Sequence, residues 1–536
     1  MSGLFFEYAA AQVQAHPNRS DVACFIGYVA RRKTVPLPVN GMAELQAGGW
    51  VDGPWRKMPE AVQSLEQLPV TVDNWAAFDS LFAWEQRQVS EGQEARCACY
   101  LGSAVRSFFA TGGKRAVIIR VGDPWACVEP NHQRTRRRLT RLLNLLPGFI
   151  APAKLSDPIT PLPLDRYEPG TWKGLQHVYG LPQVSMVCMP DLPDLLSVDV
   201  ASTPALRDPP LSPEVFVECS EDEPALTADS ALKSVAAPRC DYEGYHLWSV
   251  AIIKLRQFLQ QHRPDVILLG AVPLPQPDTA LKEALPAIYA EADLLAFLRG
   301  MGVLGESTVI DENKPPPSTF SQLTYPWLRT RRSGDLPEGI EPPDGLFAGL
   351  LAANALRKGT FRSVAGVMLP DVVETKPVPA CGDSPNSPAR QLAGRICLFA
   401  PEPGGIALQS DVTTSSDAAW QSGGVRRLVA SVLRAAREAG DNYVFEANGP
   451  RLWARVRRGM EDLLAGFWQQ GGLGGATLNE AFKVRCDRTT MSQNDMDNGR
   501  IVVEVALLPV AAIERITVVL RLEGSSGIQT NIREVA

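Results

Sequence analysis

A helix that leads directly into a wholly apolar strand constrains the fold of this chain more than any other stretch of its sequence. In GYHLWSVAIIKLRQFLQQH, residues 244–262, Leu247, Ala251 and Leu255 recur at helical spacing and predict an amphipathic helix. The segment RPDVILLGAVPLP that follows is a continuous apolar run, which is typical of a strand covered on both faces. Residues 98–113 and 114–122 predict a second helix followed by a strand. This alternation predicts an α/β layer.

The C-terminal part of the sequence predicts a second, compact α+β unit. Residues 423–440 and 448–472 have the pattern of two amphipathic helices, and AFKVRCD, GRIVVEVALLP and ERITVVLRLE that of three strands. A Pro/Ser-rich stretch at 374–392 is the candidate domain boundary. Two regions interrupt the earlier pattern: an insertion at 124–175, and a proline-rich stretch at 190–240 that we expect to be irregular and exposed.

The composition excludes several classes of protein. The chain has 536 residues, 45% of them hydrophobic, and a net charge of −6, which fits a multidomain globular protein and argues against a dedicated nucleic-acid binder. No apolar stretch is long enough for a transmembrane helix, and the N-terminus does not have the pattern of a secretion signal. The ten cysteines are scattered among expected strands and helices, so we expect buried thiols of a reducing compartment.

Residues that carry catalysis or bind metals show no recognisable arrangement in the sequence. The C-x-C pair of Cys97 and Cys99 has no second pair at zinc spacing. The glycines of GGKR, 112–115, end a helix and its lysine opens a strand, which is the wrong order for a phosphate loop. None of the five histidines has the spacing of a metal motif: His16, His132, His177, His246 and His262. We therefore expect no catalytic residue, metal or cofactor, and favour a structural or assembly role.

Several segments, taken in their order along the chain, carry a family resemblance. They are SDVACFIGYVARR, YLGSAVRSFFATGGKRAVIIRVG, LTYPWLR, PPDGLFAGLLAANALRKGTFRSVAG and the C-terminal run of two helices and three strands. This order resembles the contractile tail sheath family of contractile phages, R-type bacteriocins and phage-like injection systems. The opening GLFFEYAAAQ lacks the family's proline-glycine-valine-tyrosine, and the family's Pro-Pro-Ser-Gly is Pro-Pro-Asp-Gly at residues 342–345. These departures favour an injection-system sheath.

The resemblance implies a domain organisation. It places an inner, tube-facing α+β domain at 394–523, completed by an N-terminal strand, and an outer α/β domain at 19–393 that carries the insertions at 124–175 and 190–240. Extended arms would occupy 1–18 and 524–536.

The resemblance also implies a mechanism and partners. Subunits would form stacked hexameric rings around an inner tube protein, bounded by baseplate and terminal cap proteins, without nucleic acid and without direct insertion into a membrane. Contraction would drive the tube through a target membrane, and its energy would be the difference between two packings of the same subunits. Assembly would take place in the cytoplasm of the producing bacterium, in a phage-like particle that is then released or anchored.

The C-terminal arm has its own sequence signature. In ERITVVLRLE, Ile516, Val518 and Leu520 alternate with polar residues, as in a half-buried strand. A GSSG hinge with Gly524 and Gly527 follows, and then a second extended stretch with Ile528 and Ile532 on one side. Strand addition to a neighbouring subunit would use this stretch, with an N-terminal arm that presents Leu4, Phe6 and Tyr8 as its counterpart.

Two arginine stripes are candidates for a releasable grip on an acidic tube. One consists of Arg427, Arg434 and Arg437 opposite an apolar helix face, and the other of Arg451, Arg455 and Arg458. The alternative for each stripe is a solvated helix face, which is the usual role of a charge run. A third arginine cluster, at 134–141, is expected to lie on an amphipathic surface helix rather than to bind nucleic acid.

Two other functions remain open at this point. One is a sheath-like baseplate or cap component that does not contract. The other, in a different class, is an α/β enzyme with an unrecognised site. Microscopy separates them, because sheath subunits form long tubes or rings whereas an enzyme stays small and closed.

Overall fold

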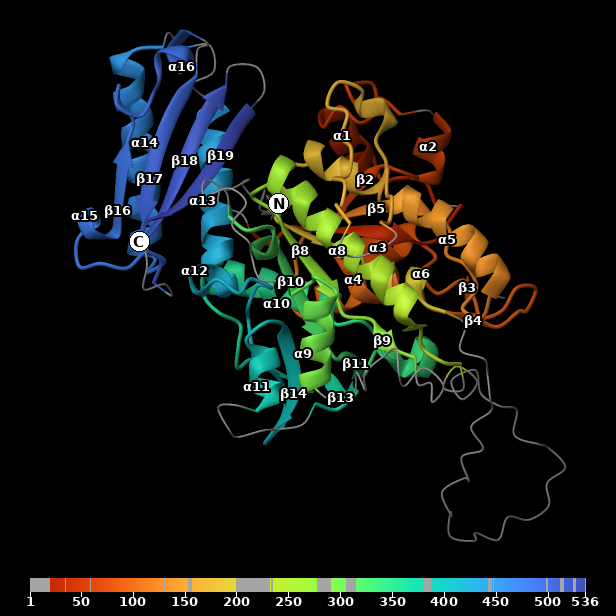
Figure 1. The fold of residues 1–536 in the computed structure, drawn as a ribbon. Coiled ribbons are helices and arrows are strands. Elements are labelled where there is room, and N and C mark those ends of the chain that lie inside the picture. The colour runs from red at the N-terminus through yellow and green to blue at the C-terminus, as the bar shows by residue number, and fades with distance from the viewer. Residues whose placement is uncertain are drawn as a thin grey trace, which may run out of the picture.

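The computed structural model describes most of the chain as two packed units (Figure 1). The described residues are 20–33, 35–57, 59–129, 131–152, 157–198, 232, 235–276, 291–304, 315–379, 387–441, 446, 448–497, 500–510, 515–523 and 527–535. The larger unit holds a nine-stranded sheet with helices on both faces, and the smaller one a four-stranded sheet with two long helices.

The large sheet is parallel in its centre and antiparallel at its edges. From β14 through β10, β8, β6 and β1 to β5, each strand runs parallel to its neighbour, whereas β2, β15 and β12 pair antiparallel. In sheet order the strands are β12 (Met368–Leu369), β15 (Gly405–Leu408), β14 (Cys397–Glu402), β10 (Ser321–Tyr325), β8 (Ile267–Ala271), β6 (Met186–Cys188), β1 (Ala23–Tyr28), β5 (Ala116–Gly122) and β2 (Pro69–Val72).

Side chains of the strands alternate between two hydrophobic cores, one on each face of this sheet. In β1, Cys24 and Ile26 join the first core, while Ala23 and Phe25 join the second. The first core is covered by α5 (Asn131–Leu145), α6 (Leu192–Leu196), α8 (Tyr242–His262) and α9 (Glu291–Gly300), and the second by α3 (Trp75–Leu81), α4 (Tyr100–Ala110) and α10 (Asp344–Arg357). The α/β layer predicted from the sequence is therefore confirmed.

Shorter elements surround the large sheet. Asn74 caps α3 by accepting a hydrogen bond from the Ala77 N–H at 2.8 Å, as the sequence predicts. The other elements are α1 (Val39–Ala47), α2 (Pro59–Ser64), β3 (Arg87–Gln88), β4 (Arg96–Cys97), η1 (Pro169–Thr171), η2 (Gly174–Gly180), β7 (Arg239–Cys240), β9 (Leu274–Pro275), η3 (Pro317–Phe320), β11 (Trp327–Thr330), η4 (Ser333–Asp335), η5 (Pro337–Gly339), β13 (Val372–Lys376) and α11 (Pro388–Ala393).

The smaller unit is an antiparallel sheet in the order β16-β17-β18-β19, covered by α13 and α14. Apolar residues of both helices and of the strands form its separate core. Its elements are α12 (Ala418–Gln421), α13 (Gly423–Asp441), α14 (Pro450–Gln469), α15 (Leu478–Ala481), β16 (Phe482–Arg485), α16 (Gln493–Asp497), β17 (Ile501–Leu507), β18 (Arg515–Glu523) and β19 (Gly527–Val535).

The boundary between the two units differs from the expected one at residue 394. The strands β14 and β15 fall within the expected inner domain, 394–523, but they pair in the large sheet. The reason lies in β14 itself, because Leu398 packs into one core of the large sheet and Phe399 into the other. The smaller unit begins at α12. Among the described strands, none before β16 joins its sheet, and the arm at 1–18 lies outside the described residues.

The two expected insertions are more integrated than their composition suggests. Within 124–175, Leu142 and Leu145 of α5 are buried in the first core, and its Arg134 and Arg138 are also buried. The start of the stretch at 190–240 is not exposed either, because every residue of α6 is buried. Most of the remainder, 199–231 and 233–234, lies outside the described residues.

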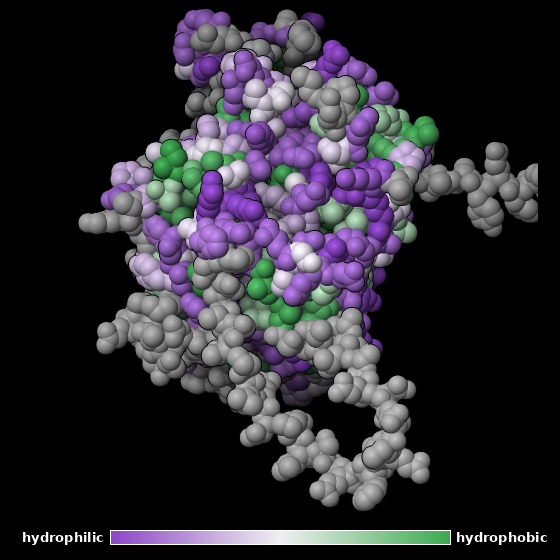
Figure 2. Space-filling view, turned by 90° about the vertical axis from the view of Figure 1, so that its right-hand side faces the viewer, coloured by the Kyte–Doolittle hydropathy of each residue, from purple (hydrophilic) through white to green (hydrophobic). Residues whose placement is uncertain are grey.

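The side of the molecule that carries α5 and the β3–β4 hairpin is mostly hydrophilic, with separate hydrophobic patches (Figure 2). Exposed apolar side chains of α5 and the loop after it include Leu139 and Ile150. None of the helices described by the structure is long and apolar enough to cross a bilayer.

Candidate functional site

The helix α13 contacts both units, through its apolar residues on one side and its arginines on the other. Its apolar residues Val425, Leu428, Val429, Val432 and Leu433 lie in the core of the smaller unit. Its opposite face, which carries the arginines, packs against the larger unit. The sequence predicts the amphipathic pattern, and the structure shows that both faces are covered.

One arginine of this face forms a buried ion pair with the larger unit. Arg427 donates to both carboxylate oxygens of Asp411, from Nη1 at 2.7 Å and from Nη2 at 2.6 Å. Its Nε donates to the Thr360 carbonyl at 2.9 Å, and Nη1 also donates to Gln322 Oε1 at 3.0 Å. Burial alone would raise the pKa of Asp411, but the Arg427 guanidinium outweighs it and holds that pKa below its usual value.

Two more arginines of α13 converge on a second carboxylate. Arg437 contacts Asp265 Oδ1 at 3.1 Å, and Arg434 donates to the Asp265 carbonyl at 3.4 Å and to Ser20 Oγ at 2.9 Å. Arg263 binds both carboxylate oxygens of Asp265 at 3.0 Å. Burial would raise the pKa of Asp265, but these cations together hold it well below the usual range.

A fourth arginine, Arg426, is buried and has no carboxylate partner in the part of the chain that the structure describes. Its guanidinium lies over the Phe320 ring at 4.2 Å and donates to the Pro264 carbonyl at 2.5 Å. Because it is buried, its pKa is lowered to about 9, and burial likewise lowers the pKa of Arg434 to about 10. The contact between the two units is therefore strongly cationic on one side, and the carboxylates of Asp265 and Asp411 offset part of that charge.

The prediction that the arginines of α13 form an exposed stripe is wrong. Arg427 and Arg434 are 5% and 7% exposed, and Arg437 is only partly exposed. A first sequence signal of this burial is that the residues between the arginines are small. These residues, Ala430, Ser431 and Ala435, are all buried. A second signal is Gly424, where an added Cβ would lie 2.3 Å from the Phe361 carbonyl oxygen.

The arginines of α14, in contrast, are exposed. Leu452, Val456, Met460, Leu464 and Phe467 face the core of the smaller unit. The opposite face carries four exposed arginines, at positions 451, 455, 457 and 458.

Neighbouring acids leave part of that positive charge unpaired. Arg455 pairs with Glu446 at 2.6 Å, and Arg457 approaches Glu461 at 3.6 Å. Arg451 and Arg458 have no ion-pair partner among the described residues. Of the two predicted stripes, only that of α14 has free charge to offer a partner.

The expected C-terminal arm forms the edge of the small sheet. β18, with Ile516, Val518 and Leu520, pairs antiparallel with β17, as expected for the last strand of its own unit. β19, with Ile528 and Ile532, folds back on β18 over nine residue pairs, from Arg515↔Val535 to Glu523↔Gly527. In the single chain, the strand that the sequence assigns to a neighbouring subunit thus pairs with β18 of the same chain.

Part of the predicted arm lies outside the described residues. This applies to Leu4, Phe6 and Tyr8 and to the hinge residue Gly524, whereas Gly527 is the first residue of β19. Strand exchange between subunits remains a prediction.

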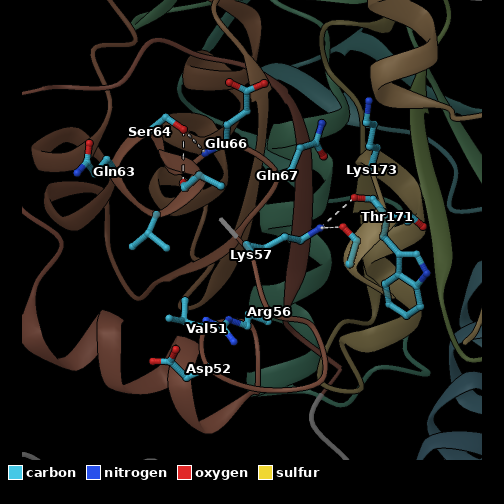
Figure 3. A pocket seen from close by; sticks show the side chains of 14 residues that line it. Val51, Asp52, Arg56, Lys57, Gln63, Ser64, Glu66, Gln67, Thr171 and Lys173 are labelled. Carbon is cyan, nitrogen blue, oxygen red and sulfur yellow. Dashed lines mark hydrogen bonds between the residues drawn. The ribbon is translucent and has the colours of Figure 1, made fainter. Parts of the chain in front are cut away.

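A surface cavity of about 1250 Å³ lies in the larger unit, between α2 and η1 (Figure 3). Lys57 reaches across it and donates to the carbonyls of Gly170 at 3.3 Å and Trp172 at 3.1 Å. The lining also includes two other cations and two acids: Arg56, Lys173, Asp52 and Glu66. Its one serine, Ser64, contacts only neighbouring backbone groups, so these lining residues do not pair a nucleophile with a base.

Histidines and metal-binding groups in the described part of the chain are dispersed. No three side chains of His, Cys, Asp or Glu come together there as metal ligands would. His177 is buried beside Trp50, and burial lowers its pKa to about 3, so it is neutral. His246 and His262 lie near opposite ends of α8, as the sequence predicts.

Comparison with known proteins identifies the smaller unit. The family model of the phage tail sheath C-terminal domain matches residues 415–523, which begin just before α12 and end with β18. No curated protein matches the sequence.

Solved structures extend the likeness to the whole chain. A chain of the anti-feeding prophage (AFP) baseplate in its contracted state is 17% identical, with 96% of each chain covered and a TM-score of 0.53. The contracted AFP helical sheath gives 16% identity, 96% of each chain and a TM-score of 0.48. The contracted sheath complex of PVC, an extracellular contractile injection system, gives 17% identity, 83% of this chain, 84% of the other and 0.46. At these identities the likeness concerns the fold. Residues 415–523 thus match the phage tail sheath C-terminal domain, and the chain shares its fold with a chain of the AFP baseplate in its contracted state.

Proposed function

We propose that this chain is a structural sheath subunit of a contractile injection machine. Its subunits would stack as hexameric rings around an inner tube, between a baseplate and a terminal cap, and contract to drive the tube through a target membrane. The observation that carries the proposal is the match of residues 415–523 to the phage tail sheath C-terminal domain, in a chain whose fold agrees with that of a chain of the contracted AFP baseplate. On this proposal the chain acts mechanically and catalyses no reaction.

The two surfaces of the smaller unit support such a role. β19 is an edge strand that is joined to its partner by a three-residue connection, 524–526. A neighbour's β19 can form the same main-chain hydrogen bonds with β18, so exchanging the strand conserves the bonds and links two subunits. The free cations of α14 would hold an acidic tube through weak, screened contacts that release readily.

A covalent trap tests strand exchange directly. Val518 lies opposite Ile532 in the β18–β19 register, so a Val518→Cys/Ile532→Cys variant places two thiols within reach of each other. If β19 is lent, oxidation of assembled particles should produce ladders of covalent oligomers on a non-reducing denaturing gel. The Val518→Cys and Ile532→Cys single variants are the matched controls. Monomers alone, obtained from particles that did assemble, would contradict the exchange.

A baseplate or cap component that does not contract is the second candidate. It is favoured by one observation, that the AFP chain with a TM-score of 0.53 comes from a baseplate structure. Negative-stain microscopy of the purified full chain, with and without its tube protein, separates the two. Tubes of many stacked rings support a sheath, whereas single closed rings support the baseplate component. A small, closed particle under both conditions would refute both.

A further inference from the structure

Two cysteines that are far from each other in the sequence meet at the side of the larger unit. The sulfur atoms of Cys97 and Cys127 are 3.1 Å apart, although the residues are separated by 30 positions. Cys97 ends β4, where it lies opposite Arg87 of β3. The Cys127 N–H donates to the Gln88 carbonyl at 3.0 Å, so β3 holds both cysteines.

The surroundings favour reaction at one sulfur first. Cys97 is 3% exposed, whereas Cys127 is only partly buried. The hydrogen bond between the two sulfur atoms lowers the pKa of the Cys127 thiol, and the Arg87 charge acts in the same direction. The thiolate is the reactive form of cysteine, and a nearby cation promotes it. An oxidant from solvent therefore meets Cys127 before Cys97.

We propose that Cys97 and Cys127 are a redox-active pair that closes to a disulfide when the folded subunit meets a low-molecular-weight disulfide, of which oxidised glutathione is the probe. The proposal is independent of the sheath function. Other described thiols do not share this arrangement: Cys99 accepts from the Gly102 N–H at the start of α4, and Cys240 lies against the Pro193 carbonyl.

The reaction balances in two exchange steps. The Cys127 thiolate attacks one sulfur of the small disulfide, forms a mixed disulfide and releases one small thiolate. The Cys97 thiol then loses its proton and attacks the Cys127 sulfur, which releases the second small thiolate. Two protein thiols are oxidised by two electrons, the small disulfide is reduced to two thiols, and those thiols take up the two protons.

The new bond would fasten a defined part of the fold. Cys97 precedes α4 and Cys127 follows β5, so the disulfide would close the segment that contains both elements. The same connection is also tied to α5, because Arg134 donates to the Cys127 carbonyl at 2.7 Å. In a reducing cytoplasm the pair stays open, and in an oxidising medium it closes.

Peptide mapping tests the pair in the full-length, folded protein. The protein is treated with oxidised glutathione, the remaining thiols are blocked with N-ethylmaleimide, and trypsin digestion follows without reductant. Cleavage after arginine gives peptides 97–106 and 121–134. The wild type should yield these two peptides linked, two hydrogens lighter than their sum, and dithiothreitol should separate them.

Matched variants assign the bond, because peptide 97–106 contains both Cys97 and Cys99. The link should persist in Cys99→Ser and disappear in Cys97→Ser, which should instead retain glutathione on Cys127. If Cys97→Ser does not fold, Cys99→Ser still decides, since Cys97 is then the only thiol in that peptide. Unlinked peptides from the treated wild type, or a link that survives in Cys97→Ser, would overturn the proposal.

Discussion

Replacing Asp411 by alanine should destabilise the contact between the two units more than any surface change. Asp411 Oδ1 accepts from Arg427 Nη1 at 2.7 Å and from Gln322 Nε2 at 2.8 Å, and Oδ2 accepts from Arg427 Nη2 at 2.6 Å and from the Val364 N–H at 3.1 Å. Asp411→Ala removes all four hydrogen bonds at once. It also leaves the Arg427 guanidinium, whose side chain is 6% exposed, without its carboxylate.

The expected loss follows from the burial of the pair. The Asp411 side chain is fully buried, and removing one partner of such a pair typically costs about 3–5 kcal/mol, because the other charge stays buried and uncompensated. The double variant Asp411→Ala/Arg427→Met removes both charges and should recover a large part of that free energy of unfolding. The pair of Arg455 and Glu446 is the control, because its side chains are 60% and 35% exposed. Glu446→Ala should cost about 0–1 kcal/mol.

Urea unfolding followed by circular dichroism measures these differences, and hydrogen exchange locates them. Because the two units have separate cores, they can unfold in separate transitions. Amide exchange in α13 is therefore measured as well as the urea transition of the whole chain. We expect α13 amides to lose protection in Asp411→Ala. The pKa of Asp411 is lowered in the fold, so its contribution is present above the pKa of the unfolded carboxyl and is lost as the pH falls through the folded pKa. An Asp411→Ala variant as stable as Glu446→Ala would refute this account of α13.

Two further predictions concern α14 and a buried acid. The charge-reversal variant Arg451→Glu/Arg458→Glu should abolish tube-dependent sheath assembly and leave the melting temperature unchanged, whereas Arg427→Glu should lower the melting temperature. Co-sedimentation with the tube protein and thermal unfolding measure these effects. Normal co-sedimentation of the charge-reversal variant counts against a tube-facing α14. Burial raises the pKa of Asp344 to about 7, and its Oδ2 has no hydrogen-bond partner among the described residues. The stability that its neutral form contributes therefore falls as the pH rises from the unfolded pKa toward 7. Asp344→Asn should stabilise the protein at pH 8 by roughly 1–3 kcal/mol and have little effect at pH 4. Equal urea midpoints for the two proteins at pH 8 would refute a raised pKa of Asp344.

Local pattern predicts an element well when the element's own residues decide its structure. The strand β8 is a continuous apolar run, and Asn74 is a cap because of its own side chain, so both follow from sequence. The helix α14 follows as well, since its apolar stripe and exposed arginines need only one covered face.

What the sequence does not reveal depends on residues far away along the chain. The arginines of α13 look like a solvated face, because Asp265 and Asp411 that neutralise them lie outside the helix. β14 lies after a linker-like stretch, so nothing local assigns it to the large sheet. Cys97 has Cys99 beside it in the sequence, and only the fold brings Cys127 to it instead.

The contact of α13 with the larger unit affects the order in which parts of the chain can fold during translation. Ser20, just ahead of β1 of the large sheet, forms hydrogen bonds with Ser431 and Arg434, which are more than 400 positions later. Domains fold during synthesis from the N-terminus. The N-terminal end of β1 can therefore be covered by α13 only after α13 has left the ribosome. The strands β16 to β19 follow α13 in the sequence, so the small sheet is completed only afterwards. On the proposed function, the strand that links subunits therefore forms after the larger unit is closed, and the order of translation delays assembly.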